Sequence, residues 1–161
     1  MKIHLIFVLL IIFIYLIIDS FSEMKMKMKC QHKNRLGKYE RYIISRYIRT
    51  EYETATDYLE DDDTIHFYMI DTNDCLVSYF HITLSKNKYF INYAYTNQKY
   101  RNKGYMKKLI LYSLKVCKDL HIEKVYSWTK LTNKNSQKLF NSMGFETESI
   151  ENGNITFVKY L

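Results

Sequence analysis

The sequence contains no proline, and glycine and alanine are scarce, with four glycines and with alanine only at Ala55 and Ala94. Codons for proline, alanine and glycine are rich in G and C, whereas lysine, asparagine, isoleucine, tyrosine and phenylalanine use AT-rich codons. We infer that the gene belongs to a compact AT-rich genome, viral or parasitic. This bias weakens any argument from the abundance of lysine or of the sixteen tyrosines. A glycine kept against the bias is, in contrast, informative, because it is needed for its backbone freedom.

Recognisable metal-binding motifs are absent as well. The three cysteines, Cys30, Cys75 and Cys117, are odd in number and far apart, and no CxxC pair occurs. The five histidines show neither HxxxH nor HExxH spacing. We therefore expect no metal site. Cys117 falls in the apolar stripe of an expected helix and is interpreted as a core thiol.

The charge is unbalanced, with a formal net charge of +7. Solubility together with codon bias explains this excess, and the alternative is an anionic partner such as nucleic acid, membrane phosphate or a phosphorylated cofactor. Nucleic-acid binding would rest on charge and aromatic content alone, so nucleic acid is not the expected partner. Hydrophobic residues make up 47% of the 161 residues, which is enough for the core of a single domain.

The longest apolar run, IHLIFVLLIIFIYLII, occupies residues 3–18. As a helix it would span about 24 Å, short of the roughly 30 Å hydrocarbon core of a bilayer. We favour a membrane anchor with the domain in the cytoplasm, because lysines follow the run. One alternative is a signal peptide cleaved after Ser22, with secretion and glycosylation at Asn154. Another is translation from Met24, which would give a cytosolic protein.

Three segments are expected along the chain. Residues 1–22 are the anchor or signal segment, and residues 23–35 are a basic, poorly ordered linker near lipid head groups. Residues 36–161 are the folded domain. The elements expected in it are one or two helices at 36–60, strands at 64–70, 75–84 and 89–96, a helix around 106–120, a strand at 124–129, a helix at 133–143 and a hairpin at 145–161.

The unit from residue 89 to residue 129 is a strand, a helix and a strand, which predicts a right-handed crossover between parallel strands. The first three strands, and the two strands of the terminal hairpin, are joined by short turns and are expected to be antiparallel. The fold class is therefore α/β, with a mixed sheet that is mainly antiparallel and has helices on both faces.

One of the four glycines, Gly104, lies in QKYRNKGYM, residues 98–106, where the strand pattern gives way to a helical one. A helix start offers unpaired N–H groups and partial positive charge, which suit phosphate. Arg101 and Lys103 add charge, and Gly104 lets the backbone approach a ligand. These features suit a site that binds a pyrophosphate. The alternative interpretation is an exposed basic turn in which the glycine only starts a helix. The GxxxxGK[ST] and GxGxxG patterns are absent, so a nucleotide P-loop and a Rossmann site are excluded.

The segment from Arg101 to Met106 resembles the acetyl-CoA-binding motif [QR]xxGx[GA] of the GCN5-related N-acetyltransferase (GNAT) superfamily. A second motif of that superfamily has an asparagine, a small residue three positions later, an aromatic residue seven positions later, and then Gly-Phe. The stretch NKNSQKLFNSMGF matches it with Asn133, Ser136, Phe140 and Gly144-Phe145. The two motifs have the order and separation seen in the family. The resemblance covers residues 64–161.

The resemblance implies a GNAT-like fold and an N-acetyltransferase that uses acetyl-CoA. The acetyl group would move to a primary amine by direct attack in a ternary complex. In the family the strand equivalent to residues 89–96 splays from the next one, here 125–129, and CoA enters the gap. Backbone amides of residues 101–106 would hold the pyrophosphate, and an amide near position 95 or 96 would polarise the thioester. The cofactor-binding residues implied are Tyr95, Thr96, Arg101, Asn102, Lys103, Gly104, Tyr105, Met106, Asn133 and Phe140.

Two positions depart from the family pattern. Met106 stands where the family prefers Gly or Ala, and we expect its side chain to enter the core. Phe140 stands where many members have a tyrosine proposed to protonate the leaving thiolate. A thiol of pKa about 8.5 leaves as thiolate near neutral pH, and water or the Ser136 hydroxyl could supply the proton.

No catalytic residue is assigned by a motif. Tyr95 and Ser136 are the candidates, and Tyr93, Tyr95 and His81 are possible proton relays, since no Asp or Glu lies in the strand at 89–96. The acceptor, a small molecule or a protein amine, has no recognisable motif. The alternative function is a catalytically weak or inactive GNAT-fold binding module tethered to a membrane.

Overall fold

A computed structural model describes residues 27–32, residue 44 and residues 64–161. These residues form one seven-stranded sheet of order β1-β2-β3-β4-β5-β7-β6 together with two α-helices and one 3-10 turn. The elements are β1 (Lys27–His32), β2 (Thr64–Ile70), β3 (Leu76–Ser85), β4 (Lys88–Thr96), η2 (Gln98–Tyr100), α3 (Tyr105–Asp119), β5 (Lys124–Lys130), α4 (Lys134–Asn141), β6 (Glu146–Glu151) and β7 (Asn154–Tyr160).

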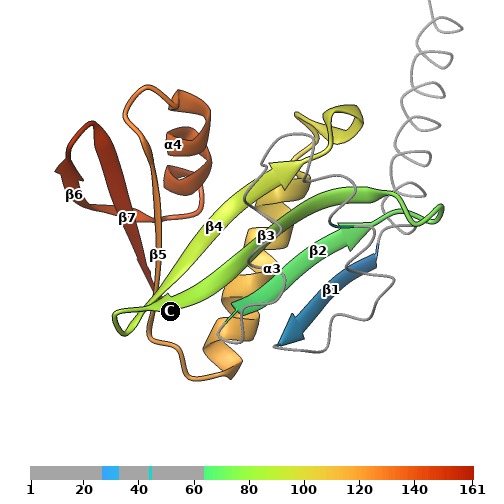
Figure 1. Cartoon of the computed structure of the whole chain (residues 1–161), viewed down its shortest axis with the longest axis horizontal. Helices are drawn as coiled ribbons and strands as arrows, with labels where there is room; N and C mark the ends of the chain where they lie inside the picture. The colour runs from blue at the N-terminus through green and yellow to red at the C-terminus, as the bar shows by residue number, and fades with distance from the viewer. Residues whose placement is uncertain (1–26, 33–43, 45–63) are drawn as a thin grey trace, which may run out of the picture.

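The sheet is mixed, as expected. All neighbouring strands pair antiparallel except β4 and β5, which are parallel and are joined by the crossover helix α3. Figure 1 shows α3 packed across one face of the sheet behind β3 and β4. The strands and helices expected from residue 64 onward are thereby confirmed, with bounds that differ by one or two residues.

The main core lies between α3, α4 and one face of the sheet. In α3 the stripe of Leu109, Ile110, Leu114 and Cys117 is buried, so the expectation of a core thiol at Cys117 is confirmed. Residues from β2, β3, β4, β5 and β7 complete this cluster, and α4 adds Phe140.

The opposite face of the sheet carries a second, smaller cluster. Tyr68, Tyr79 and Tyr95 belong to it, together with Ile44, which is helical and fully buried. Ile44 is the one described residue within the helical region expected at 36–60. The other residues of that region lie outside the part of the chain that the structure describes.

The linker predicted over residues 23–35 is wrong for its central part. Residues 27–32 form the edge strand β1, which pairs antiparallel with β2 from Lys27 opposite Ile70 to His32 opposite Ile65. The folded sheet therefore begins before residue 36. The expected anchor at residues 3–18 lies outside the described residues. Within residues 27–32, 44 and 64–161, no helix has both the length and the apolar character needed to cross a membrane.

Candidate functional site

Strands β4 and β5 form a fork. Only three residue pairs join them, ending at Ile91 opposite Ser127, although β4 continues to Thr96 and β5 to Lys130. The Ser127 hydroxyl donates to the Ile91 carbonyl at 3.5 Å at the last of these pairs. Figure 1 shows the two strands close together at their paired ends and diverging beyond them. The splay that the family resemblance implied is therefore present.

A β-bulge in β4 accounts for the divergence. Tyr79 of β3 pairs with Tyr95 and His81 pairs with Asn92, so β4 contains one extra residue between the two pairs. Within this interval Tyr93 has a φ of 51°, a left-handed conformation that non-glycine residues seldom adopt. A bulge bends its strand and increases the local twist. Because the bulge begins just after Asn92, one residue beyond the last pair with β5, β4 turns away from β5 at that point.

Beyond the bulge, one edge of β4 has no partner strand among the described residues. The Asn97 amide donates to the Val77 carbonyl at 3.0 Å, so Asn97 faces β3. Since successive residues of a strand face opposite neighbours, the Thr96 amide and carbonyl face the fork. Arg101 Nε donates to that carbonyl at 2.9 Å. This edge is suited to an extended, amide-containing ligand that pairs like an added strand.

The loop between η2 and α3 forms a cradle of backbone amides, residues 101–106. Asn102 and Gly104 have φ angles of 62° and 77°, and Lys103 between them has no positive φ. Such alternation makes successive N–H groups converge into an anion-binding concavity. The bond from the Lys108 amide to the Gly104 carbonyl is 3.0 Å long and starts the helical ladder. The Arg101 amide donates to the Gln98 carbonyl at 3.3 Å, whereas the amides between Arg101 and Lys108 have no partner within α3, and residues 101–104 are exposed.

Position 104 favours glycine because of its backbone conformation, and not because neighbouring atoms leave no room for a side chain. A Cβ added there would meet nothing within 4 Å, but the φ of 77° belongs to the region that side-chain-bearing residues avoid. Tyr105 is buried in the main core and Met106 packs against it, as expected for Met106. In both residues the side chain points inward while the amide lies at the open helix start.

The base of the cradle is fastened to the turn between β2 and β3. The Tyr100 hydroxyl donates to Asp71 Oδ2 at 2.6 Å, and the Asn73 and Cys75 amides donate to Asp71 Oδ1. Burial alone would raise the pKa of Asp71, but these hydrogen bonds and nearby Lys99 lower it on balance. The carboxylate therefore stays ionised and holds η2 in place.

Two residues implied as cofactor-binding have structural roles in α4. The Asn133 side chain accepts a hydrogen bond from the Ser136 amide at 3.1 Å, which makes Asn133 the N-cap of the helix. Phe140 is 4% exposed and its ring lies 5.1 Å from that of Phe145 and 5.5 Å from that of Phe157. Phe140 is therefore a core side chain, whereas residues 95–106 gather around the fork and the cradle.

The second face of the sheet carries a buried chain of ring side chains beside the bulge. The Tyr79 hydroxyl lies 3.0 Å from His66 Nδ1 and 3.2 Å from His81 Nδ1. The ring of Tyr93 lies 5.2 Å from that of His81. Burial, and secondarily the neighbouring His66, lowers the pKa of His81 to about 3, so His81 is neutral at physiological pH. Burial raises the pKa of Tyr79 above its ordinary value.

Among these four buried ring side chains, the sequence analysis had named His81 and Tyr93 as possible proton relays, but it had not named His66 or Tyr79. Their signal is weak, because a histidine or tyrosine at alternate positions of a strand is ordinary core packing.

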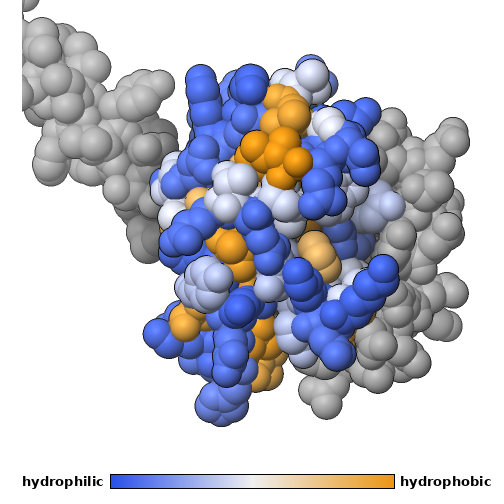
Figure 2. All heavy atoms as spheres, turned by 90° about the vertical axis from the view of Figure 1, so that its left-hand side faces the viewer, coloured by the Kyte–Doolittle hydropathy of each residue, from blue (hydrophilic) through white to orange (hydrophobic). Residues whose placement is uncertain are grey.

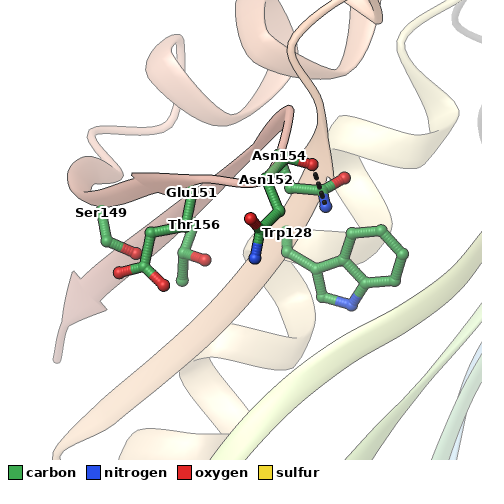
Figure 3. A pocket seen from close by; sticks show the side chains of 6 residues that line it. All are labelled: Trp128, Ser149, Glu151, Asn152, Asn154 and Thr156. Carbon is green, nitrogen blue, oxygen red and sulfur yellow. Dashed lines mark hydrogen bonds between the residues drawn. The ribbon is translucent and has the colours of Figure 1, made fainter.

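A cavity of about 360 Å³ lies beside the fork and was also missed. Trp128 is 53% exposed there, at the first position of β5 beyond its last pair with β4. The signal that could have found it is the chain's single tryptophan, which lies in the strand expected at 124–129. Figure 3 shows the lining side chains, which are those of Trp128, Ser149, Glu151, Asn152, Asn154 and Thr156.

Similar folds occur in solved N-acetyltransferases. PaiA N-acetyltransferase from Thermoplasma acidophilum, solved in complex with coenzyme A, is 16% identical over 84% of this chain and 99% of its own, with a TM-score of 0.64. The ribosomal-protein-S18-alanine N-acetyltransferase from Escherichia coli is 8% identical over 83% and 94%, with a TM-score of 0.67. NAA60 from Arabidopsis thaliana, solved with a bisubstrate analogue, is 14% identical over 83% and 98%, with a TM-score of 0.64. Identities this low establish the fold alone.

The family assignment rests on the sequence. A comparison with curated proteins finds no match. The acetyltransferase (GNAT) family profile matches residues 33–145, more than half of the chain, and the match includes the fork, the cradle and α4. The chain therefore belongs to the acetyltransferase (GNAT) family.

Proposed function

We propose that the protein transfers the acetyl group of acetyl-CoA to a primary amine by direct attack in a ternary complex. The observation that carries this proposal is the fork between β4 and β5, with the amide cradle at the end of β4. An extended ligand bound along β4 and an anion bound on the cradle would be contiguous, as the pantetheine and pyrophosphate of one CoA molecule are.

The residues of the fork and cradle fit acetyl-CoA by their chemistry. The amides of residues 101–106 would hold the pyrophosphate, and exposed Arg101 and Lys103 add positive charge. The Thr96 amide faces the fork and would donate to an amide oxygen of pantetheine or to the thioester carbonyl. Acetyl-CoA supplies an activated acyl group on a thiol leaving group. The chain's own part is to align that group with the amine and to keep a hydrogen-bond donor at its carbonyl.

Proton transfer is assigned here to water and hydroxyl groups. Phe140 has no hydroxyl and is buried, so it cannot protonate the leaving thiolate. A thiol of pKa about 8.5 needs little assistance at neutral pH. Ser136, half-buried in the first turn of α4, and Tyr95 are the candidate donors, and His81 with Tyr93 lies on the face that would receive the amine.

Calorimetry of acetyl-CoA binding to the full-length chain tests the cofactor site first. We expect saturable binding, followed by thiol release when a panel of primary amines is added. Absence of binding at millimolar acetyl-CoA, by a protein shown to be folded, would overturn the placement of the cofactor. Binding without thiol release would support the second candidate, a GNAT-fold binding module with little turnover. The observation that favours this candidate is the replacement of the family tyrosine by Phe140.

We also propose that residues 3–18 anchor the protein to a membrane and leave the domain in the cytoplasm. The apolar run and the lysines after it support this proposal. Expressed in cells, the full-length chain should sediment with membranes and resist carbonate extraction, and an externally added protease should spare its domain in intact cells. Recovery of the domain in the medium would support signal cleavage instead.

A further inference from the structure

The cavity beside the fork indicates what kind of amine the protein acetylates. We propose that the acceptor carries a second, protonated amine, as a diamine or polyamine does, and that the cavity between Trp128 and Glu151 binds this second cation. The inference rests on the proposed function, because it takes the amine to be attacked at the fork. It names a substrate class for that site.

The cavity begins where the reacting groups would meet. Trp128 follows Ser127, the last β5 residue that pairs with β4, so its side chain lies at the branch point of the fork. In register, Trp128 lies opposite Thr156 of β7, which in turn lies opposite Ser149 of β6. Trp128 and Tyr126 alternate with Ser127 and therefore lie on the same face, the one that also carries His81. An acceptor approaching the fork from this face would pass the indole.

The lining of the cavity suits an ammonium group. It combines one indole, one carboxylate and four neutral hydrogen-bonding side chains, and no lysine or arginine is among the lining residues. An indole face attracts cations, and carboxylate and amide oxygens accept the hydrogen bonds of an ammonium. Trp128 is 53% exposed, whereas Tyr126 on the same face is 5% exposed, so the indole surface is accessible to a ligand. Figure 2 shows that the hairpin side of the molecule is largely hydrophilic, with only scattered apolar patches.

The protein already binds one ammonium in this manner. Lys88 Nζ lies 4.6 Å from the centre of the Tyr126 ring and 3.5 Å from Glu148 Oε1. Its two partners come from β5 and β6. Trp128 lies two residues beyond Tyr126 in β5, and Glu151 lies three residues beyond Glu148 in β6. Between Trp128 and Glu151 there is a cavity, and no lysine of the protein is among its lining residues. A ligand ammonium in the cavity would thus repeat an arrangement present within the chain.

The spacing favours an acceptor with two separated nitrogens. Glu151 pairs with Asn154 of β7, which pairs with Lys130 of β5, so two strand intervals, about 10 Å, separate the Glu151 backbone from β5. The nitrogen that attacks must be neutral, so its own charge is not available to the carboxylate in the reacting state. A second nitrogen several methylene groups away remains protonated and can reach Glu151 while the first lies at the fork.

Lys130 carries the opposite charge to Glu151 near the cavity, so removing one charge or the other should have opposite effects on the binding of a cationic acceptor. It lies in the same cross-strand row as Glu151, is exposed, and is not part of the cavity lining. Neutralising Glu151 should weaken the binding of a dication, whereas neutralising Lys130 should strengthen it. A structural contribution of either residue to the hairpin would not produce opposite effects.

Steady-state acetylation by the full-length chain tests the substrate class, with spermidine, 1,4-diaminobutane, n-butylamine and a lysine-containing peptide as acceptors. We expect kcat/KM for spermidine to exceed that for n-butylamine by about tenfold or more, since an indole and a carboxylate together act on the second charge. Glu151→Gln should raise KM for spermidine several-fold and leave kcat and the n-butylamine rates unchanged. Trp128→Leu should act likewise, and Lys130→Gln should lower KM. Glu146→Gln is the matched control, because Glu146 is exposed on the same strand but does not line the cavity.

A binding measurement separates failure of this inference from failure of the proposed function. Spermidine is titrated calorimetrically into the protein saturated with CoA, with n-butylamine as the reference. Binding of spermidine that Glu151→Gln weakens would support the inference even without turnover. Equal use of mono- and diamines, no effect of Glu151→Gln, or preference for the peptide would overturn it while leaving the acetyltransferase function in place. No binding of spermidine at millimolar concentration would overturn it as well.

Discussion

Arg101 Nε donates to the main-chain carbonyl of Thr96 at 2.9 Å, so the guanidinium joins the cradle to the open edge of β4. The sequence had suggested a role for Arg101 as a charge near the pyrophosphate. The structure adds a positioning role, because the same side chain fixes the last residue of β4 relative to the loop that follows it.

Replacement of Arg101 by lysine should therefore impair cofactor binding although the charge is kept. Lysine has no donor equivalent to Nε and lacks the planar, multiply donating guanidinium group. We expect Arg101→Lys to raise KM for acetyl-CoA by about tenfold, equivalent to the loss of one good hydrogen bond to a charged group. Lys103→Gln is the control, because it removes an exposed charge and should produce a smaller effect that salt abolishes. Equal effects of the two substitutions would contradict a bracing role.

Gly104→Glu should abolish CoA binding while the domain stays folded. The substitution strains the left-handed backbone by about 1–2 kcal/mol and places a carboxylate beside the pyrophosphate. Gly153→Glu is a close control, because Gly153 has a φ of 74° and equally open surroundings in the β6–β7 turn. Both variants should lose a similar amount of stability in thermal unfolding, but only the first should lose calorimetric binding of CoA. Normal CoA binding by Gly104→Glu would show that the pyrophosphate is held elsewhere.

Phe140→Tyr, which restores the side chain common in the family, should lower stability. The added hydroxyl enters a core site between Phe145 and Phe157, where an unpaired polar group costs about 1–3 kcal/mol. We expect a lower midpoint of chemical denaturation with an unchanged slope, and an unchanged Kd for acetyl-CoA. A variant that is as stable as the parent and has a higher kcat would indicate instead that the hydroxyl reaches the fork.

The buried histidine next to the bulge should make stability depend on pH. His81 has a folded pKa of about 3 against an ordinary value of 6.5, so the unfolded chain takes up a proton first as the pH falls. The stabilisation from neutral His81 is thus fully present above pH 6.5 and is lost between pH 6.5 and pH 3, at up to about 1.4 kcal/mol per pH unit. Urea unfolding between pH 7.5 and 5.0 should show this decline, and His81→Gln should flatten it. An identical decline in the variant would assign the effect to other groups.

The course of the chain from Thr64 onward follows from sequence periodicity. Alternating runs and one apolar helical stripe predicted strands and helices close to their observed bounds. Gly104 and the N-cap Asn133 marked the two helix starts by their chemistry. These are local signals, and local preference agrees with tertiary structure over most of this region.

Strand β1 was missed although its signal is present in the sequence. MKMKMK alternates methionine with lysine, which is the period of a half-exposed edge strand. Its lysines were interpreted as a basic linker because they follow an apolar run. Lysine on an edge strand is one common means of preventing further strand addition, so the same residues fit both interpretations.

The bulge at Tyr93 and the cavity at Trp128 could not be predicted in this way. A tyrosine with positive φ has no sequence signature, since its conformation is imposed by the pairing of β3 on one side and the loss of β5 on the other. The cavity depends on side chains from β5, β6 and β7 that only the register brings into one group.

The short junction between β4 and β5 also has a consequence for how the chain folds and opens. Strands β2 to β4 are joined by tight turns, and so are β6 and β7, so each side of the sheet can form from local contacts. Within the described sheet only three residue pairs join the two sides, and helix α3 connects them along the chain. We expect amide hydrogen exchange to detect two cooperative units with different opening free energies. A molecule that fills the gap should slow exchange most at Ile91 and Ser127, where the two units meet.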